Sequence, residues 1–312
     1  MELSDLKANL KRINDATRWG TIPSGIGQLD ENYIFERGKI TLLGGRPGAL
    51  TSKFLLQLIA NACIQEYNPL LFFCYGIPRQ ELINRLLFNL TKDPIFLSDI
   101  LRIQNTSHGD GEYYGYSIAR KHPDAFKREF ELLKNVPFCL ETRKEFKNLD
   151  TLCEVLRIRA KRQGIALVIL DYLQCFALPS LSNGNLSMET KRNRELRKLQ
   201  KLAQELDIHI LITSKLGKHI DFRKRHQKRP RIKDLEIAKP FRCIDNIILA
   251  YRPEYHGIKV WDRYSDSLGR IPTKGCLELR VLKTSETIDC LLEFNCSYTQ
   301  LSPKIFKMNN AN

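Results

Sequence analysis

The chain has 312 residues, of which 43% are hydrophobic and 27% are charged. These values are ordinary for a soluble globular protein with a sizeable core, and no apolar run approaches the roughly 18–20 residues of a membrane span. The formal net charge of +15 is not ordinary, and it favours binding to polyanions through release of their counterions.

Nine cysteines are present, and no two of them form a CxxC pair. Buried, reduced thiols in a cytoplasmic protein are therefore expected. The acidic, amphipathic N-terminus is not typical of a secretory signal. No metal site is indicated by the spacing of histidines, cysteines and carboxylates.

Residues 1–18 are predicted to form one amphipathic helix, because Leu3, Leu6, Leu10 and Ile13 recur at helical spacing. This stripe would pack either on its own domain or on a neighbouring subunit, and the spacing favours neither.

From residue 38 onward, strand-like apolar runs alternate with helical patterns. The expected strands are residues 40–44, 70–74, 137–141, 167–171, 208–213, 246–251, 277–282 and 290–295. The expected helices are residues 54–65, 80–90, 124–134, 150–163 and 190–205. This alternation predicts an α/β fold with a mostly parallel central sheet, helices on both faces and an antiparallel C-terminal edge. Loops are predicted at residues 179–188 and 215–233.

A glycine-rich turn follows the first expected strand and precedes a helix; it reads Gly45-Arg46-Pro47-Gly48-Ala49-Leu50-Thr51-Ser52. Strand, turn and helix in this order form a P-loop, where backbone N–H groups and the helix N-terminus bind phosphates. The P-loop pattern ends in Gly-Lys-Ser/Thr. Here Leu50 and Thr51 stand in place of the glycine and the lysine, and only Ser52 agrees. The turn predicts an NTPase scaffold with an altered phosphate site.

The expected strand at residues 167–171 ends in a carboxylate, Asp171. A P-loop NTPase holds Mg²⁺ with a serine or threonine of the P-loop and an acid of this kind. Ser52 and Asp171 are therefore the candidate Mg²⁺ ligands if nucleotide binds.

Two motifs resemble those of the DnaB family of replicative helicases. Residues 170–174, Leu-Asp-Tyr-Leu-Gln, are similar to the family's second nucleotide motif, and residues 45–47 with Ser52 are similar to its first. The resemblance covers roughly residues 20–302 and implies a RecA-like P-loop NTPase fold for them. Residues 1–19 would then be a linker-like helix and residues 303–312 a tail, and the family's N-terminal domain would be expected to be absent.

By the same resemblance, the residues that would cleave a triphosphate are replaced. The phosphate-binding lysine corresponds to Thr51, the catalytic base to Gly76 and the arginine finger to Ser285. A residual nucleotide site would consist of Gly45, Arg46, Pro47, Gly48, Thr51, Ser52, Asp171, Lys215 and Lys283. This set implies either no cofactor or Mg-ATP or Mg-ADP bound without hydrolysis.

Residues 215–233 are strongly basic and, by the resemblance, include the loop that follows single-stranded DNA. The candidate DNA-binding residues are Lys215, Lys218, Arg223, Lys224, Arg225, Lys228, Arg229, Arg231 and Lys233. Such side chains neutralise phosphates without reading sequence, although a charge run is more often a solvated surface. Phe222 lies among them and could stack on a base.

Three functions follow as hypotheses. The first is a degenerate DnaB-like protein of DNA replication that binds single-stranded DNA, assembles with itself or with an intact DnaB-type helicase, or does both. The second is an active ATP-dependent 5′–3′ DNA helicase in which Lys215 or Lys283 replaces the missing lysine. The third is a regulatory module that binds a protein and no nucleic acid.

Overall fold

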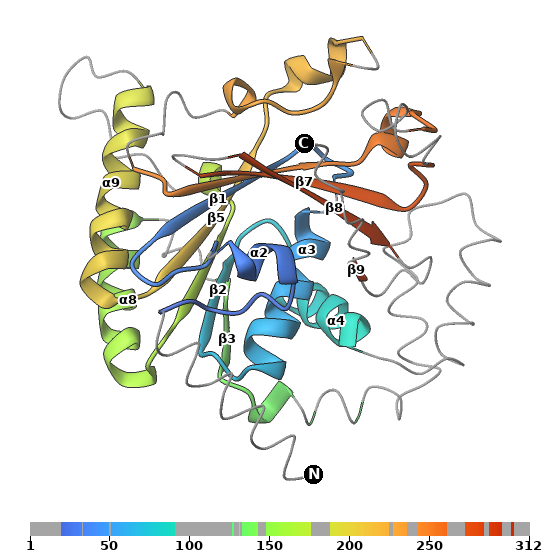
Figure 1. Cartoon of the computed structure of the whole chain (residues 1–312). Helices are drawn as coiled ribbons and strands as arrows, with labels where there is room; N and C mark the ends of the chain where they lie inside the picture. Colours follow the sequence, from blue (N-terminus) through green and yellow to red (C-terminus); the bar gives the residue numbers. More distant parts are fainter. Residues whose placement is uncertain are drawn as a thin grey trace.

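Figure 1 shows a computed structural model of the chain. The structure describes residues 20–32, 34–49, 51–90, 127, 131, 133–142, 148–175, 188–224, 227–235, 243–260, 272–283, 287–294 and 301–302. The expected helix at residues 1–18 and most of the expected loop at 179–188 lie outside them. The same holds for most of the expected helix at 124–134.

The centre of the molecule is a nine-stranded sheet in the order β3-β2-β4-β5-β1-β6-β7-β8-β9. The strands are β1 (Ile40–Gly45), β2 (Leu70–Cys74), β3 (Phe138–Glu141), β4 (Leu167–Asp171), β5 (His209–Lys215), β6 (Asn246–Tyr251), β7 (Cys276–Lys283), β8 (Thr287–Phe294) and β9 (Leu301–Ser302). The first six strands of that order are parallel to their neighbours, and β7, β8 and β9 pair antiparallel. The predicted fold class is thereby confirmed, and the short β9 was not predicted.

One short helix, α2 (Gly27–Glu31), precedes β1. The helices that connect parallel strands are α3 (Thr51–Ile59), α4 (Arg79–Leu90), α8 (Leu149–Gln163) and α9 (Met188–Leu206). A π-helix, η1 (Ala60–Gln65), continues α3, so the single helix predicted at residues 54–65 begins three residues earlier and changes its winding halfway. Short 3₁₀ helices are η3 (Leu173–Cys175), η4 (Lys218–Phe222), η6 (Ile232–Asp234) and η8 (Pro253–His256).

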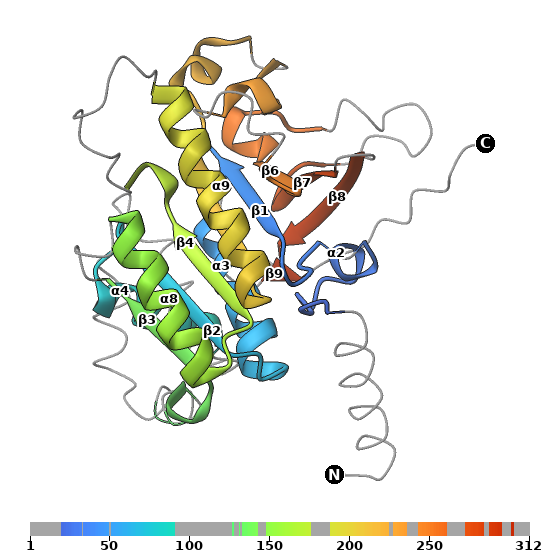
Figure 2. The same ribbon diagram turned by 90° about the vertical axis from the view of Figure 1, so that its left-hand side faces the viewer.

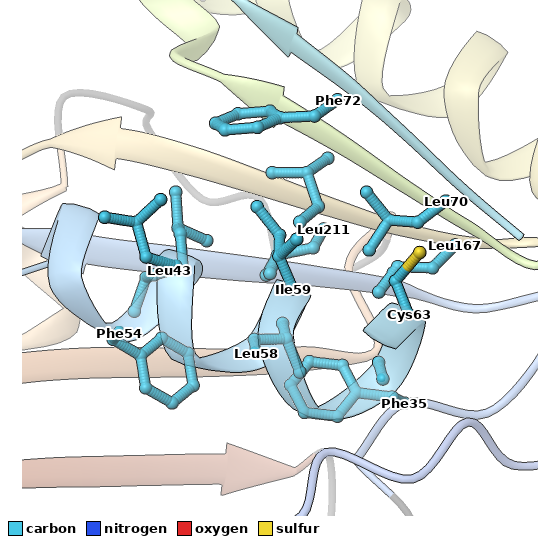
Figure 3. Close-up of a cluster of buried hydrophobic side chains, with 14 of the residues drawn as sticks. Phe35, Leu43, Phe54, Leu58, Ile59, Cys63, Leu70, Phe72, Leu167 and Leu211 are labelled. Atoms are coloured by element: carbon cyan, nitrogen blue, oxygen red, sulfur yellow. The ribbon is translucent and has the colours of Figure 1, made fainter. Parts of the chain in front are cut away.

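Two helical layers cover the sheet, α8 and α9 on one face and α3 and α4 on the other (Figure 2). Successive strand residues point to opposite faces, so both faces need apolar side chains. On β1, Leu43 packs with Phe54 and Ile59 of α3 (Figure 3), whereas Leu42 lies in the second core cluster on the other face. This is why the parallel strands are nearly continuous apolar runs.

Local sequence fixes the ends of α8. The Asn148 side chain accepts hydrogen bonds from the backbone N–H groups of Asp150 and Thr151, as a helix N-cap does. Gly164 ends the helix in the left-handed conformation, with φ of 61°, which glycine adopts without strain. None of the helices among the described residues is long and apolar enough to cross a bilayer.

One buried histidine gives the fold a pH dependence. His209 is fully buried, its Nδ1 lies 2.6 Å from the Glu36 carbonyl oxygen, and burial lowers its pKa to about 4. Since the unfolded chain takes up a proton near pH 6.5, stability falls as pH drops below that value. Between pH 7 and 5 we expect the free energy of unfolding to fall by about 2 kcal/mol on this account. Urea titrations of the native protein and of His209→Gln check this, and equal losses in both would contradict it.

Candidate nucleotide and nucleic-acid site

The sheet gathers the predicted nucleotide residues at one edge. In the parallel register, Gly45 at the end of β1 lies opposite Lys215 of β5 and Ala250 of β6. Asp171 lies opposite Cys74 at the ends of β4 and β2. The P-loop, Asp171 and Lys215 therefore share the carboxyl edge of the sheet, where ligands bind in open α/β folds.

The P-loop turn has the backbone of a phosphate loop without its cation. The Ala49 N–H donates to the Arg46 carbonyl, and Gly48 has φ of +84°, which favours glycine. Thr51 opens α3, and its methyl group packs so close to Gly45 that a Cβ there would lie 2.3 Å from it. The hydroxyl of Thr51 carries no positive charge, so the loop cannot neutralise a triphosphate as the lysine would.

Asp171, a predicted Mg²⁺ ligand, is held by hydrogen bonds at the end of β4. The Thr213 hydroxyl donates to one of its carboxylate oxygens at 2.5 Å, and the Cys74 thiol lies 3.7 Å from the other. Burial raises the pKa of Asp171, while the hydrogen bonds from Thr213 and Cys74 oppose that rise. Burial, aided by the nearby carboxylate, raises the pKa of Cys74 to about 12.

The Lys215 side chain lies over the ring of Tyr172, which directly follows Asp171. Its Nζ lies 3.9 Å from the centroid of the Tyr172 ring, a cation–π contact. The Gln174 side chain accepts from the Lys215 N–H at 3.2 Å and donates to the Ser214 hydroxyl at 3.1 Å. These bonds join the end of β5 to η3, which follows Asp171.

Lys283 lies at the opposite edge of the sheet from its own P-loop. Through the registers, Lys283 of β7 pairs with Asn246, and Asn246 pairs with Thr41, four residues before Gly45 on β1. At about 3.3 Å per residue, the two positions are about 13 Å apart along the strand. The register therefore does not favour Lys283 as a substitute for the missing lysine in its own chain.

Residue 76, where the resemblance places the catalytic base, is a glycine and supplies no carboxylate. Gly76 lies against the Tyr172 ring, whose nearest atom would be 3.4 Å from a Cβ at this position. The next carboxylate along the chain, Glu81, lies on α4 and is paired with Arg85 at 2.7 Å. Ser285, at the expected finger position, lies outside the described residues.

Two oxygen donors of the predicted Mg²⁺ site are present in the described residues. Ser52 and Asp171 offer the oxygen ligands that Mg²⁺ prefers. At the positions where the resemblance places the lysine and the base, Thr51 carries no positive charge and Gly76 no carboxylate. Elsewhere in the described chain, no cluster of three or more histidines, cysteines or carboxylates is arranged to hold a metal.

The P-loop is held by two contacts that the sequence did not indicate. Arg46 Nη1 donates to the Leu216 carbonyl at 3.0 Å, and its Nε and Nη2 both bind the Asp221 carboxylate. The Tyr255 ring of η8 covers Gly48, where a Cβ would lie only 2.5 Å from it. A hollow lined by Arg46, Tyr255 and their neighbours has a volume of about 10 Å³, which is room for about one water molecule.

The basic segment 215–233 is more ordered than the predicted loop. Lys215 belongs to β5, and η4 and η6 follow it. Both 3₁₀ helices are fixed around Asp234, whose side chain is fully buried. Burial would raise the pKa of Asp234, but hydrogen bonds from Arg223, His219 and the Arg231 N–H together lower it.

The nine predicted DNA-binding residues fall into separate groups. Arg223 pairs with Asp234, and Arg229 Nε lies 3.0 Å from a carboxylate oxygen of the buried Glu278. Arg225 lies outside the described residues. Lys215 contacts the Tyr172 ring, and its charge acts on Asp171. Within the described part of the chain, the five remaining cations have no carboxylate partner: Lys218, Lys224, Lys228, Arg231 and Lys233. The two paired arginines stabilise the segment, and the five others form no ion pair among the described residues.

Residues 21–301 match the protein family described as DnaB-like helicase C terminal domain. The chain belongs to this family. A probable replicative DNA helicase of Trieres chinensis is 24% identical over 237 residues, 75% of this chain and 48% of that protein. The replicative DNA helicase DnaB of Buchnera aphidicola (strain APS) is 25% identical over 258 residues, 81% of this chain and 52% of that protein. The chain thus spans about half the length of the curated relatives it matches.

Solved structures share the fold of this domain. One of them, described as an ATPase domain, superposes with a TM-score of 0.67 at 19% identity, and the match covers 96% of each chain. A DnaB-like replicative helicase, solved in a study of its interactions with primase, also gives 0.67 at 19% identity, over 96% of this chain and 66% of that one. These matches confirm the RecA-like fold that the two sequence motifs predicted.

Three residues that matter at this edge were missed by the sequence analysis as site residues. Asp221 was not predicted to take part, although it binds the P-loop arginine, Arg46. Asp234 and Tyr255 were not predicted to take part in the site. For Asp221 and Asp234, the available signal was a single carboxylate inside or directly after a basic run. Nothing in the sequence pointed to Tyr255.

Proposed function

We propose that this DnaB-like domain binds single-stranded DNA in DNA replication without hydrolysing ATP. The observation that carries the proposal is the group of five cations without carboxylate partners in the basic segment 215–233, beside a P-loop that lacks its lysine. Cations without carboxylate partners lie in the basic segment 215–233, whereas Thr51 leaves the lysine position of the P-loop uncharged. The names of the relatives, replicative DNA helicases, support a role in replication.

Affinity for DNA should come from phosphate neutralisation. Lysine and arginine contacts release about 0.7 counterions per neutralised phosphate of a single strand, so five contacts give a log–log salt slope of about −3.5. Between 50 and 200 mM salt, the affinity should then fall by about 100-fold. The paired Arg223 and Arg229 would add little to this slope.

The test is a filter-binding titration with single-stranded oligonucleotide at several salt concentrations. The double variant Lys218→Gln/Lys224→Gln removes two exposed cations of the segment and should reduce the slope by about 1.4. The matched control, Lys161→Gln/Arg162→Gln, removes the same charge from exposed positions at the end of α8, at the amino edge of the sheet. The control should change the slope by much less.

Two results would reject the proposal. One is the absence of binding at low salt. The other is equal loss in the two double variants, because a diffuse effect of net charge would then explain the binding. Nuclease-resistant co-purification of a protein partner, together with no DNA affinity, would favour the regulatory module instead.

Assembly is the second part of the proposal. The position of Lys283, far from its own P-loop, favours a contribution to the nucleotide site of a neighbouring subunit over its own. The neighbour would be another copy of this chain or an intact DnaB-type helicase. Light scattering of the purified protein, alone and mixed with such a helicase, measures this. A monomer in both samples would exclude it.

The cytoplasmic location expected from the sequence stays a prediction.

A further inference from the structure

Phe222 is an apolar side chain that the fold leaves in water. It is 88% exposed, more than any other large hydrophobic residue among those described, whereas Phe35, Phe54, Phe72 and Phe73 are almost fully buried. Exposed phenylalanine costs the protein the free energy that burial would provide. Single exposed apolar residues are common, so exposure alone assigns no role.

The residues around Phe222 are all fixed to the body of the protein. Ile220 is fully buried, and Asp221 binds Arg46 of the P-loop. On either side, the His219 ring and the Arg223 guanidinium bind the buried Asp234. Phe222 is thus the outward-pointing member of a turn that four neighbours hold in place, so its exposure does not come from a loose chain end.

The charges beside the ring are positive. Lys218 and Lys224 are exposed, have no carboxylate partner among the described residues, and lie four residues before and two residues after Phe222. Single-stranded nucleic acid is bound in this way elsewhere: cations track the backbone while an aromatic ring stacks on a base. A protein surface that binds phosphates only has no need of an exposed aromatic ring.

We propose that Phe222 stacks on an unpaired base of single-stranded DNA whose phosphates are bound by Lys218 and Lys224. This inference rests on the proposed function and adds a base-dependent component to it. The anchored turn presents the ring in one place, so little side-chain or loop freedom is lost when the base arrives. Stacking is tolerant of base identity, because every base has a π-face. The segment would therefore bind single strands without sequence preference.

The test compares two oligonucleotides of the same length, one of thymidines and one of abasic sugar–phosphate units. Native protein should bind the thymidine strand more tightly than the abasic strand. Phe222→Ala should lose about 5- to 150-fold for the thymidine strand and little for the abasic one, so that the two affinities converge. Phe222→Trp should keep the preference, and the thymidine strand should quench its added fluorescence.

The control is Tyr67→Ala, which removes an exposed aromatic ring just before β2, at the opposite edge of the sheet. It should change neither affinity. Unchanged thymidine binding by Phe222→Ala, or equal losses for the two strands, would overturn the inference and leave the phosphate-binding function standing. If the native protein binds neither strand at low salt, the proposed function fails, and this inference fails with it. Because Phe222 is exposed, each of its variants should unfold at the same temperature as the native protein.

Discussion

Purified protein supplied with Mg-ATP and single-stranded DNA is expected to release phosphate at least about 10³-fold more slowly than an intact DnaB-type helicase assayed beside it. The reason is that, by the resemblance, several parts of the reaction are replaced at once. Thr51 carries no charge toward the phosphates, and Gly76 offers no carboxylate to orient water. An arginine finger alone contributes about 10³–10⁵ in rate, so its replacement would suffice for the expected difference.

Two variants make this measurement decisive. Asp171→Asn removes the carboxylate at the end of β4 and should leave the residual rate unchanged. Robust phosphate release that Asp171→Asn abolishes would establish an active helicase and overturn the proposal. Thr51→Lys restores a cation to the loop and should tighten Mg-ATP binding measured by calorimetry. It should not restore turnover, because Gly76 still lacks the base.

Replacing the buried carboxylate of the basic segment 215–233 is expected to destabilise the protein strongly. Asp234 is 1% exposed and binds Arg223, His219 and the Arg231 N–H. Asp234→Ala leaves the Arg223 guanidinium beside a vacated acceptor, and breaking a buried pair in this way costs about 3–5 kcal/mol. Urea unfolding followed by circular dichroism measures the loss.

The control for this prediction is Asp221→Asn. The Asp221 side chain is 44% exposed, and exposed pairs of this kind contribute about 0–1 kcal/mol. A loss below about 1 kcal/mol for Asp234→Ala would show that the segment is not organised around this carboxylate. The DNA affinity of Asp234→Ala gives a second, independent test of this role. Removing a negative charge should by electrostatics alone strengthen DNA binding, so weaker binding by Asp234→Ala shows that the carboxylate positions the segment.

Much of the fold follows from patterns that are local in the sequence. The strands at residues 70–74, 167–171 and 246–251 were predicted with the observed bounds, because buried parallel strands are short apolar runs between polar turns. The observed ends of a strand differ from the predicted ones where hydrogen bonds from neighbouring segments determine where the strand ends. The expected strand at residues 208–213 extends to Lys215, since β1 and Gln174 supply hydrogen bonds to its last residues.

The candidate site was predicted less completely. The altered P-loop and Asp171 follow from the order of residues along the chain, and the fold brings both to the carboxyl edge of the sheet. The basic segment 215–233 was predicted as one set of equivalent DNA-binding cations. The structure separates that set, because Arg223 and Arg229 pair with buried carboxylates.

What the sequence alone determined is the identity of the groups present. It predicted a phosphate loop with Thr51 in place of the lysine, and it contains a strand ending in Asp171 and an excess of cations from the end of the fifth strand onward. What only the tertiary structure decided is which of those groups are already paired and which edge of the sheet each one reaches. Arg46 and Asp221 lie 175 positions apart, and Arg229 and Glu278 lie 49 apart. Such pairs depend on packing between distant segments, and the strand register that places Lys283 is likewise set by pairing across the sheet. The local periodicity of the sequence carries no information on these ion pairs or on the strand register.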